Sequence, residues 1–385
     1  MRIPTSGAAI IWFGTRGFMF EDHNRVEVFD LGSKTYLSPV SVGNQPTGVA
    51  LTPDGALLAV VNSGDGTVSV VDPTKISVVA TWNTLAVGET PANTQALTAA
   101  TTTQHRALVG VNYPGTLGGG AIHVLNLDTG VLSCAGYAWC ANGKNVSGFG
   151  LAAMASTPDG SKVFLAGGAV GMLDLTTNTL ATGFTGSFSD AAADADSNVF
   201  AASLGVSNAQ LSRIQIMAYE PYASTDVRFG SVFGEKLNPS GSLLFMPQTT
   251  GVDIFDVHTG RLVQHVLLPE SIPVDLGGLA LDETGTKMFL ISNSGITIAD
   301  LFDLPLSIAS ANPSSGLPGS QVTIRGSGFQ NGTNISFGGM QVVPTFIDQN
   351  TLSAPIPSLP SGPVRVTVTN PDGRTYDFDA AFSVQ

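Results

Sequence analysis

Short segments in which apolar and polar residues alternate recur along the first 300 residues of the chain. Seven of them share one pattern and usually end in an acidic or turn residue: VEVFD, VSVVD, IHVLN, VGMLD, IQIMA, VDIFD and ITIAD, which begin at residues 26, 68, 122, 170, 214, 252 and 296. Alternation with a period of two predicts a β-strand with one buried face. The spacing of 38 to 54 residues is typical of a β-propeller, in which each repeat folds into one small sheet. The seven copies therefore predict seven blades.

Turn sequences of matching chemistry precede most of these marker strands. They read TPDG at residues 52 and 157, DADS at 194, NPSG at 238 and DETG at 282. Proline fixes φ at the second position of a turn and glycine accepts a positive φ, so these segments predict β-hairpins. A second turn and another strand follow the marker, as in SVVATW after residue 76. Each repeat is thus predicted to be a four-stranded antiparallel sheet.

One repeat carries a resemblance to a known family. Residues 48–82, GVALTPDGALLAVVNSGDGTVSVVDPTKISVVATW, resemble the YVTN β-propeller repeat, with Val61, Asn62 and Ser63 where that family has its name-giving residues. The resemblance extends from about Trp12 to Asp303, and the third and fifth repeats depart from it. It implies a seven-bladed propeller over residues 1–303.

The two ends of this ring lack strands in the sequence pattern. The first copy has no innermost strand before its other strands, and the last copy has no outer strand after Asp300. Propellers commonly complete one blade with strands from both termini. We therefore expect a truncated first blade and, upstream of Met1 in the natural gene product, further residues that close the ring.

The last eighty residues follow a different pattern, in which the marker strand no longer occurs. Residues 304–385 resemble the IPT/TIG immunoglobulin-like domain through the segments NPSSG from Asn312, VTIRGSGF from Val322, FGG from Phe337 and VTVTNPDG from Val366. The alternating apolar residues of these segments place one face inward, as a two-sheet sandwich requires. In bacteria the resemblance implies a spacer, adhesion or carbohydrate-associated module on an exported protein, and in animals it implies a receptor or a DNA-binding transcription factor. The acidic balance and the accompanying propeller favour the bacterial setting.

Composition and charge narrow the class of protein. Hydrophobic residues make up 43% of the chain, charged residues 12%, and 45 residues are glycine, which favours a folded all-β protein with many tight turns. The net charge of −13 repels phosphate backbones, so nucleic acid is not expected as a partner. No apolar run approaches the roughly 20 residues that a membrane helix needs. We expect a secreted, periplasmic or cell-surface protein without a transmembrane segment.

The only two cysteines, Cys134 and Cys140, lie close together in the loop-like segment CAGYAWC. An oxidising compartment would allow a disulfide between them. Two unpaired thiols fit the sequence equally well.

Candidate chemistry is sparse. No histidines have metal-ligand spacing, and His123 and His265 lie in predicted strands, where solvated or partly packed side chains are expected. Two acidic groups could hold a cation, namely Glu21-Asp22-His23 and the set Asp190, Asp194 and Asp196. A solvated turn explains the first group, and capping of a turn explains the second. We predict no catalytic residue, no metal site and no cofactor.

Two functions remain. A binding module would use the loops of a rigid propeller to recognise a protein or carbohydrate of the cell envelope. A lactonase or lyase would instead gather His, Glu and Asp side chains on several innermost strands. The recognisable innermost strands, such as GVALT and GLALD, carry mainly small and apolar residues. The sequence therefore favours the binding module and does not specify its ligand or oligomeric state.

Overall fold

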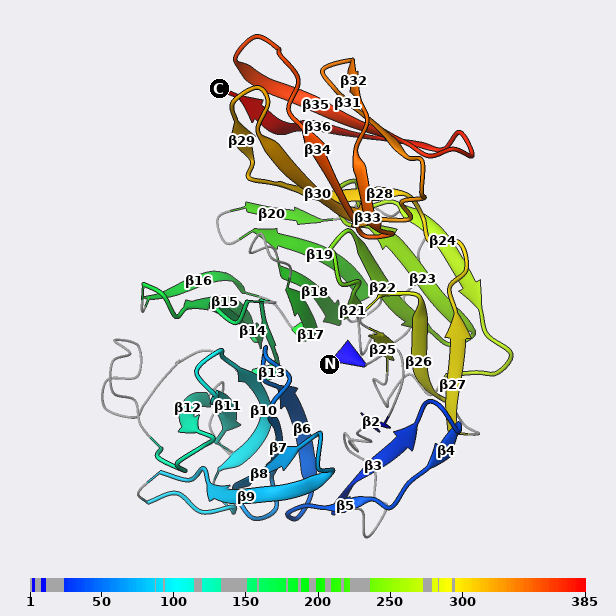
Figure 1. The fold of residues 1–385 in the computed structure, drawn as a ribbon. Helices are drawn as coiled ribbons and strands as arrows, with labels where there is room; N and C mark the ends of the chain where they lie inside the picture. Colours follow the sequence, from blue (N-terminus) through cyan, green and yellow to red (C-terminus); the bar gives the residue numbers. More distant parts are fainter. Residues whose placement is uncertain are drawn as a thin grey trace.

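The computed structural model describes most of the chain as strands and turns (Figure 1). It describes residues 2–3, 8–11, 24–86, 88–92, 94–113, 120–132, 151–157, 159–177, 179–185, 188–193, 199–204, 209–215, 218–221, 236–272, 279–282, 284–292 and 295–385. These residues form seven sheets arranged in a ring and two further sheets at the carboxyl end. The predicted all-β class, a seven-bladed propeller followed by an immunoglobulin-like sandwich, is confirmed.

Each sheet of the ring corresponds to one repeat of the sequence pattern and is called a blade here. Blade 1 contains β2 (Ala8–Ile11), β3 (Arg25–Asp30), β4 (Thr35–Tyr36) and β5 (Val40–Ser41), and blade 2 contains β6 (Pro46–Leu51), β7 (Leu58–Asn62), β8 (Thr67–Asp72) and β9 (Ser77–Asn83). Blade 3 contains β10 (Gln95–Thr101), β11 (Arg106–Asn112) and β12 (Gly120–Asn126). Blade 4 contains β13 (Leu151–Ser156), β14 (Lys162–Gly167), β15 (Ala169–Asp174) and β16 (Thr179–Thr185). Blade 5 contains β17 (Phe188–Ala193), β18 (Val199–Leu204), β19 (Ala209–Gln215) and β20 (Ala218–Pro221). Blade 6 contains β21 (Lys236–Leu237), β22 (Leu243–Gln248), β23 (Gly251–Asp256) and β24 (Leu262–Leu267). Blade 7 contains β1 (Arg2–Ile3), β25 (Leu279–Asp282), β26 (Lys287–Ser292) and β27 (Gly295–Asp300).

In blades 2, 3, 4 and 6 the marker strand is the third strand of the sheet, counted from the ring axis. In blade 2, β8 pairs antiparallel with β7 on one side and with β9 on the other. Its residues Val68, Val70 and Val71 are almost fully buried, and Val68 and Val70 pack with Val109 of blade 3. The alternating apolar residues thus fill the space between neighbouring blades, which is why the repeat needs them.

The turns of the repeat are held by side-chain caps. In blade 2 the Thr52 hydroxyl donates to Asp54 (2.6 Å), and Gly55 takes a φ of 74° that an L-residue rarely adopts. After the marker strand, Asp72 accepts backbone hydrogen bonds from Thr74 and Lys75. The acidic residue that ends the marker strand is therefore a turn cap.

Blade 7 is assembled from two distant parts of the chain. The short β1 pairs in parallel with β25, with Arg2 opposite Leu281, on the side away from β26 (Figure 1). At the other side of the blade, β27 pairs with β26 and is the last strand of the sheet. The chain then passes through residues 301–306 into the carboxyl-terminal domain.

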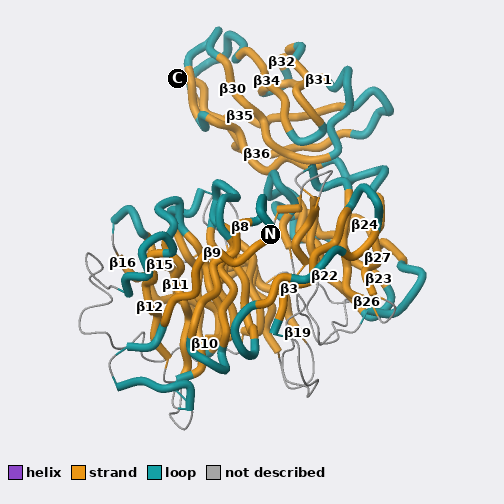
Figure 2. The backbone as a smooth tube through the Cα atoms, turned by 60° about the horizontal axis from the view of Figure 1, so that its bottom comes forward, coloured by secondary structure: helices purple, strands orange, loops and turns teal. Residues whose placement is uncertain are grey.

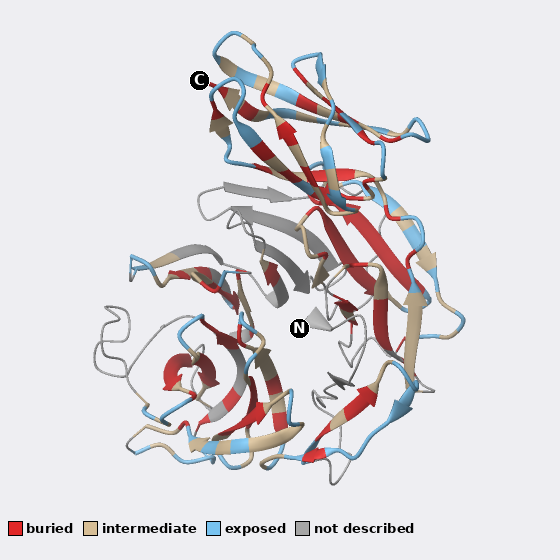
Figure 3. Ribbon diagram, in the orientation of Figure 1, coloured by how far each residue is buried: buried red, intermediate tan, exposed pale blue. Residues whose placement is uncertain are grey.

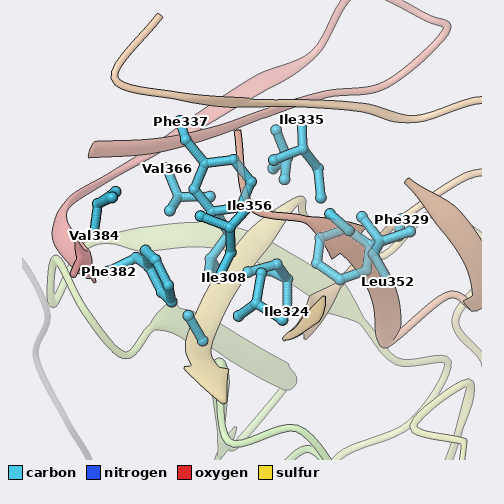
Figure 4. Close-up of a cluster of buried hydrophobic side chains, with 14 residues drawn as sticks. Ile308, Ile324, Phe329, Ile335, Phe337, Leu352, Ile356, Val366, Phe382 and Val384 are labelled. Atoms are coloured by element: carbon cyan, nitrogen blue, oxygen red, sulfur yellow. The ribbon is translucent and has the colours of Figure 1, made fainter. Parts of the chain in front are cut away.

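The carboxyl-terminal domain is a sandwich of two sheets. One sheet contains, in sheet order, β28 (Ser307–Asn312), β30 (Gln321–Ser327), β34 (Thr351–Pro355) and β33 (Thr345–Asp348), and the other contains β29 (Ser315–Gly316), β36 (Thr375–Val384), β35 (Gly362–Thr369), β31 (Asn334–Phe337) and β32 (Met340–Val342). Apolar side chains from both sheets meet between them (Figure 4). The rings of Phe337 and Phe382 lie edge to face at the centre, with centroids 5.7 Å apart.

The segment Gly326-Ser327-Gly328-Phe329 holds the start of this domain in place. A Cβ on Gly326 would lie 2.2 Å from the carbonyl oxygen of Ser307, so only glycine fits there. The Ser327 hydroxyl donates to the carbonyl of Pro305 (2.8 Å), and Gly328 has a φ of 68°. The motif therefore fixes the linker between the ring and the sandwich.

Replacing Gly326 with alanine should destabilise the sandwich, because the new methyl group overlaps the backbone of Ser307. We expect a loss of about 2–3 kcal/mol or more in the free energy of unfolding of this domain, measured by chemical denaturation. The control is Gly319→Ala, where φ is 86° but no atom lies within 4 Å of the added Cβ. That variant should lose only about 1 kcal/mol, and equal losses would contradict the steric explanation.

Candidate functional site: the junction of ring and sandwich

The sandwich meets the ring beside blades 6 and 7, as Figures 1 and 2 show. The contact is centred on Asp256, the residue that ends β23 in the turn-capping position of the repeat. Like its counterparts, Asp256 caps its own turn, because the backbone N–H and the hydroxyl of Thr259 both donate to Oδ1 (2.7 Å each). It differs from them in being only 1% exposed.

The sandwich provides the groups that cover this carboxylate. Ser307 donates its hydroxyl to Oδ2 of Asp256 (2.5 Å), and Tyr376 donates to Oδ1 (3.1 Å). Burial, and then the charge of Asp256, raises the pKa of Tyr376, so the phenol stays a donor. The rings of His258 and Phe378 also lie edge to face, with centroids 4.4 Å apart. Because a buried carboxylate needs these donors, the junction is a fixed contact.

A second group of contacts joins the sandwich to blade 7. Asn350 and Gln349 donate their side-chain N–H groups to the carbonyl of Thr284, at 2.8 and 3.2 Å. Arg374 forms an ion pair with Asp303 of the linker (2.7 Å). The sandwich is thereby held by two neighbouring blades, and its orientation on the ring is defined at several points.

The linker presents one aromatic side chain at this junction. Leu301 and Leu304 are buried in the apolar cluster that also contains residues of blades 6 and 7. Between them, Phe302 is 94% exposed. Anchoring on both sides keeps the ring of Phe302 outside the core, so a large apolar surface stands on a rigid support.

Polar groups elsewhere in the ring serve to hold the loops that connect blades. The second residue of the marker segment is Ser69 in blade 2, His123 in blade 3 and Thr297 in blade 7. Ser69 accepts a hydrogen bond from the backbone of Gly43 (3.2 Å), and the Thr297 hydroxyl donates to Glu270 (2.7 Å). In both cases the partner lies in the loop that enters the blade.

In blade 3 the same position carries ionisable groups. His123 is 4% exposed, with Nδ1 lying 2.6 Å from the carbonyl oxygen of Thr84 and Nε2 lying 3.4 Å from Glu89. The Tyr113 hydroxyl donates to Glu89 (2.8 Å), and burial followed by this bond raises the pKa of Tyr113. His123 is therefore buried, whereas the sequence suggested a solvated or partly packed side chain. It holds the loop that enters blade 3.

His105 bridges two blades on the ring surface. It occupies the turn position at which four other repeats have Gly55, Gly160, Gly241 and Gly285, with a φ of 50°, and its ring nitrogens lie 2.8 Å from Asp54 and 3.1 Å from Asp128. The bonds to Asp54 and then Asp128 raise the pKa of His105. The sequence did not predict a role for His105, although the absence of glycine from its turn was a signal for one.

Several residues predicted from the sequence lie outside the described residues, namely Cys134 and Cys140, the group Glu21, Asp22 and His23, and Asp194 and Asp196. Asp190 lies in β17, and only the backbone of this residue is described. His265 is paired with Asp253 (2.5 Å) at the outside of blade 6. Within the described ranges no group of His, Cys, Asp and Glu side chains is placed to hold a metal ion. In the same ranges no helix is long and apolar enough to cross a membrane.

Comparison with protein families identifies the sandwich. Residues 306–383 match the IPT/TIG domain family. No curated protein sequence matches the chain.

Solved structures share the fold of the ring. A chain of the hydrazine synthase of Kuenenia stuttgartiensis is 17% identical, with a TM-score of 0.54, and the match covers 72% of this chain and 89% of that one. The Dos1 propeller is 14% identical, with a TM-score of 0.53 and coverages of 72% and 73%. A chain of the mitotic checkpoint complex is 13% identical, with a TM-score of 0.55 and coverages of 73% and 82%. At these identities the likeness shows the fold, and the chain is a β-propeller joined to an IPT/TIG domain.

Replacing Asp256 with alanine should release the IPT/TIG domain from the ring. The hydroxyls of Ser307 and Tyr376 would lose a charged acceptor, at a cost of about 2–4 kcal/mol. Calorimetry should then show the IPT/TIG domain unfolding in a separate transition at lower temperature than the ring.

The matched control is Asp174→Ala in blade 4. Asp174 caps the same turn, accepting from the backbone N–H groups of Thr176 and Thr177, but no residue of the IPT/TIG domain appears among its partners. The Asp174→Ala variant should lose the turn cap without separating the two domains. Similar calorimetric traces for the two variants would show that Asp256 has no special role at the junction.

The bridge of His105 should make ring stability depend on pH. Because its pKa is raised above 6.5, the bridge is fully present below pH 6.5 and is lost as pH rises through the folded value. His105→Gly should therefore be less stable than the parent at pH 5.5, by roughly 0.5–1 kcal/mol. Near pH 9 it should be equally or more stable, since glycine accepts the positive φ.

Thermal unfolding of both proteins across this pH range measures the effect. Asp128→Asn removes one partner of His105 and leaves the backbone of its turn unchanged, so it should weaken the pH dependence without the gain near pH 9. A stability difference between His105→Gly and the parent that does not vary with pH would refute the bridge.

Proposed function

We propose that this protein is an interaction module that recognises another protein at the junction of its propeller and IPT/TIG domain. The observation that carries the proposal is Phe302, which is 94% exposed between two buried leucines of a fixed linker. Burial of a phenylalanine side chain contributes about 2–3 kcal/mol to binding. Because both domains hold the linker, little conformational entropy is lost when a partner covers the phenyl ring of Phe302.

The inner strands of the ring support binding over catalysis. The hydroxyl of Thr47 donates to the carbonyl of Ala96 (2.9 Å), and the hydroxyl of Thr101 donates to that of Leu51 (2.6 Å). These hydroxyls join blades 2 and 3 to each other. They are engaged in structure, which gives the alternative of a lactonase or lyase in the channel little support.

The setting we propose is outside the cytoplasm, on a secreted or surface-exposed bacterial protein. The acidic balance, the low content of charged residues and the likeness of residues 48–82 to the YVTN repeat favour this setting. A carbohydrate of the envelope would be the alternative ligand.

The test is a binding screen of the purified chain on arrays of envelope proteins and glycans. Saturable binding to a protein should weaken at least about tenfold in Phe302→Ser, since the apolar surface that the partner would bury on this side chain is removed. The fold should be unaffected, because the side chain has almost no contacts to lose.

The control is Leu267→Ser, which replaces a side chain that is 75% exposed on the outer strand of blade 6. It should bind like the parent. Protein binding that tolerates Phe302→Ser would place the site elsewhere. Binding of a glycan only, or turnover of a lactone, would replace the proposal with one of its alternatives.

A further inference from the structure

The strand β27, which is the marker strand of blade 7, is more exposed than the marker strands of blades 2 and 6. Every residue of β27 is partly or fully exposed, whereas β23 of blade 6 is buried along its whole length. Figure 3 shows the contrast between the two strands. In blade 6 the strand β24 covers the outer side of β23. Among the described residues, no strand covers the outer side of β27.

The free side of β27 carries backbone groups that can pair. Ser292 lies opposite Gly295 in the ladder, and the backbone of Leu301 donates to the carbonyl of Thr286. In an antiparallel ladder, hydrogen-bonded pairs alternate with non-bonded ones. The N–H and C=O groups of Ile296 and Ile298 therefore point away from β26, toward the open edge.

Blade 2 shows what such an edge accepts. There Val68 and Val70, the counterparts of Ile296 and Ile298, lie opposite Trp82 and Ala80 of β9. The side chains of β9 alternate between partly buried and exposed over residues 78–83, and Ala80 and Trp82 pack against the core. An extended segment of six or seven residues with alternating apolar side chains fits this kind of edge.

The chain downstream of β27 does not supply that segment. In blade 2 a tight turn leads from β8 directly into β9, but after Asp300 the chain enters the linker and then β28 of the IPT/TIG domain. Two residues past β27 stands Phe302, the exposed side chain of the junction. The open edge thus continues directly into the proposed binding site.

We propose that blade 7 binds an extended segment of a partner protein as an added antiparallel strand along β27, with an apolar side chain of that segment packed on Phe302. This inference rests on the proposed function and specifies its mode of recognition. Backbone hydrogen bonds to Ile296 and Ile298 would provide general affinity, and Phe302 would provide preference for an apolar residue at the end of the strand.

The experiment uses a synthetic peptide with the sequence of residues 75–84, KISVVATWNT, which contains the outer strand of blade 2. Hydrogen–deuterium exchange of the full chain is followed with and without the peptide. At a free peptide concentration four times its Kd, the amides of Ile296 and Ile298 should exchange about fivefold more slowly. A peptide that is N-methylated at the residues corresponding to Ala80 and Trp82 cannot donate at the two paired positions and should give no protection.

Two variants of the chain separate the contributions. Ile298→Pro removes an N–H that faces the edge and leaves the ladder to β26 complete, so peptide protection should be lost. Phe302→Ser should weaken the peptide about tenfold through lost apolar burial and cannot be confused with misfolding, because its side chain is exposed. Leu267→Ser serves again as the unaffected control.

Three results would overturn the inference. The first is slow exchange of the Ile296 and Ile298 amides in the free chain, which would show that another part of the same chain covers the edge. Self-association that protects β27 would assign the edge to a second copy. No protection by a saturating peptide would exclude strand addition. If the peptide fails while Phe302→Ser still abolishes binding to an array protein, strand addition is wrong and the proposed function stands.

Discussion

The arrangement of the two domains depends on the burial of one carboxylate. Asp256 caps a turn in the ring through Thr259 and accepts the hydroxyls of Ser307 and Tyr376 from the IPT/TIG domain. A carboxylate that is 1% exposed is stable only while these donors remain in place, since unpaired burial of a charge is costly. Separation of the domains would break two of the bonds at once. The junction is therefore a permanent part of the fold.

This constraint determines what the linker can do. Because the domains are fixed on either side of it, residues 301–306 cannot fold back to hide Phe302, and the edge of β27 cannot be covered by a strand that follows it in the chain. The surface that results combines an exposed aromatic ring with unpaired backbone groups. A rigid surface of this composition binds with a small entropic cost, which is the physical basis for assigning recognition to it.

The sequence predicted the repeated parts of the molecule well, because seven marker strands and their turns record the same packing requirement seven times. It could not predict the junction. Asp256, Asp72 and Asp174 end equivalent strands with the same residue, and only contacts from residues about 50 and 120 positions further along bury the first of them. The burial of His123 was missed for a related reason, since its partners Thr84 and Glu89 belong to the preceding repeat. Periodicity reports which face of a strand is buried and does not identify the polar residues of another repeat or domain that contact it.

Comparison of equivalent positions is what reveals the specialised part of a repeat protein. Where Asp72 ends a strand at the surface, Asp256 lies under a second domain, and where Val70 lies under an outer strand, Ile298 lies at an open edge. Both departures occur in neighbouring blades, on the two sides of the same linker. Closure of the ring by both chain ends is one reason for blade 7 to differ. One departure attaches a domain and the other leaves backbone groups unpaired beside an exposed aromatic ring, and the recognition that we propose would use both.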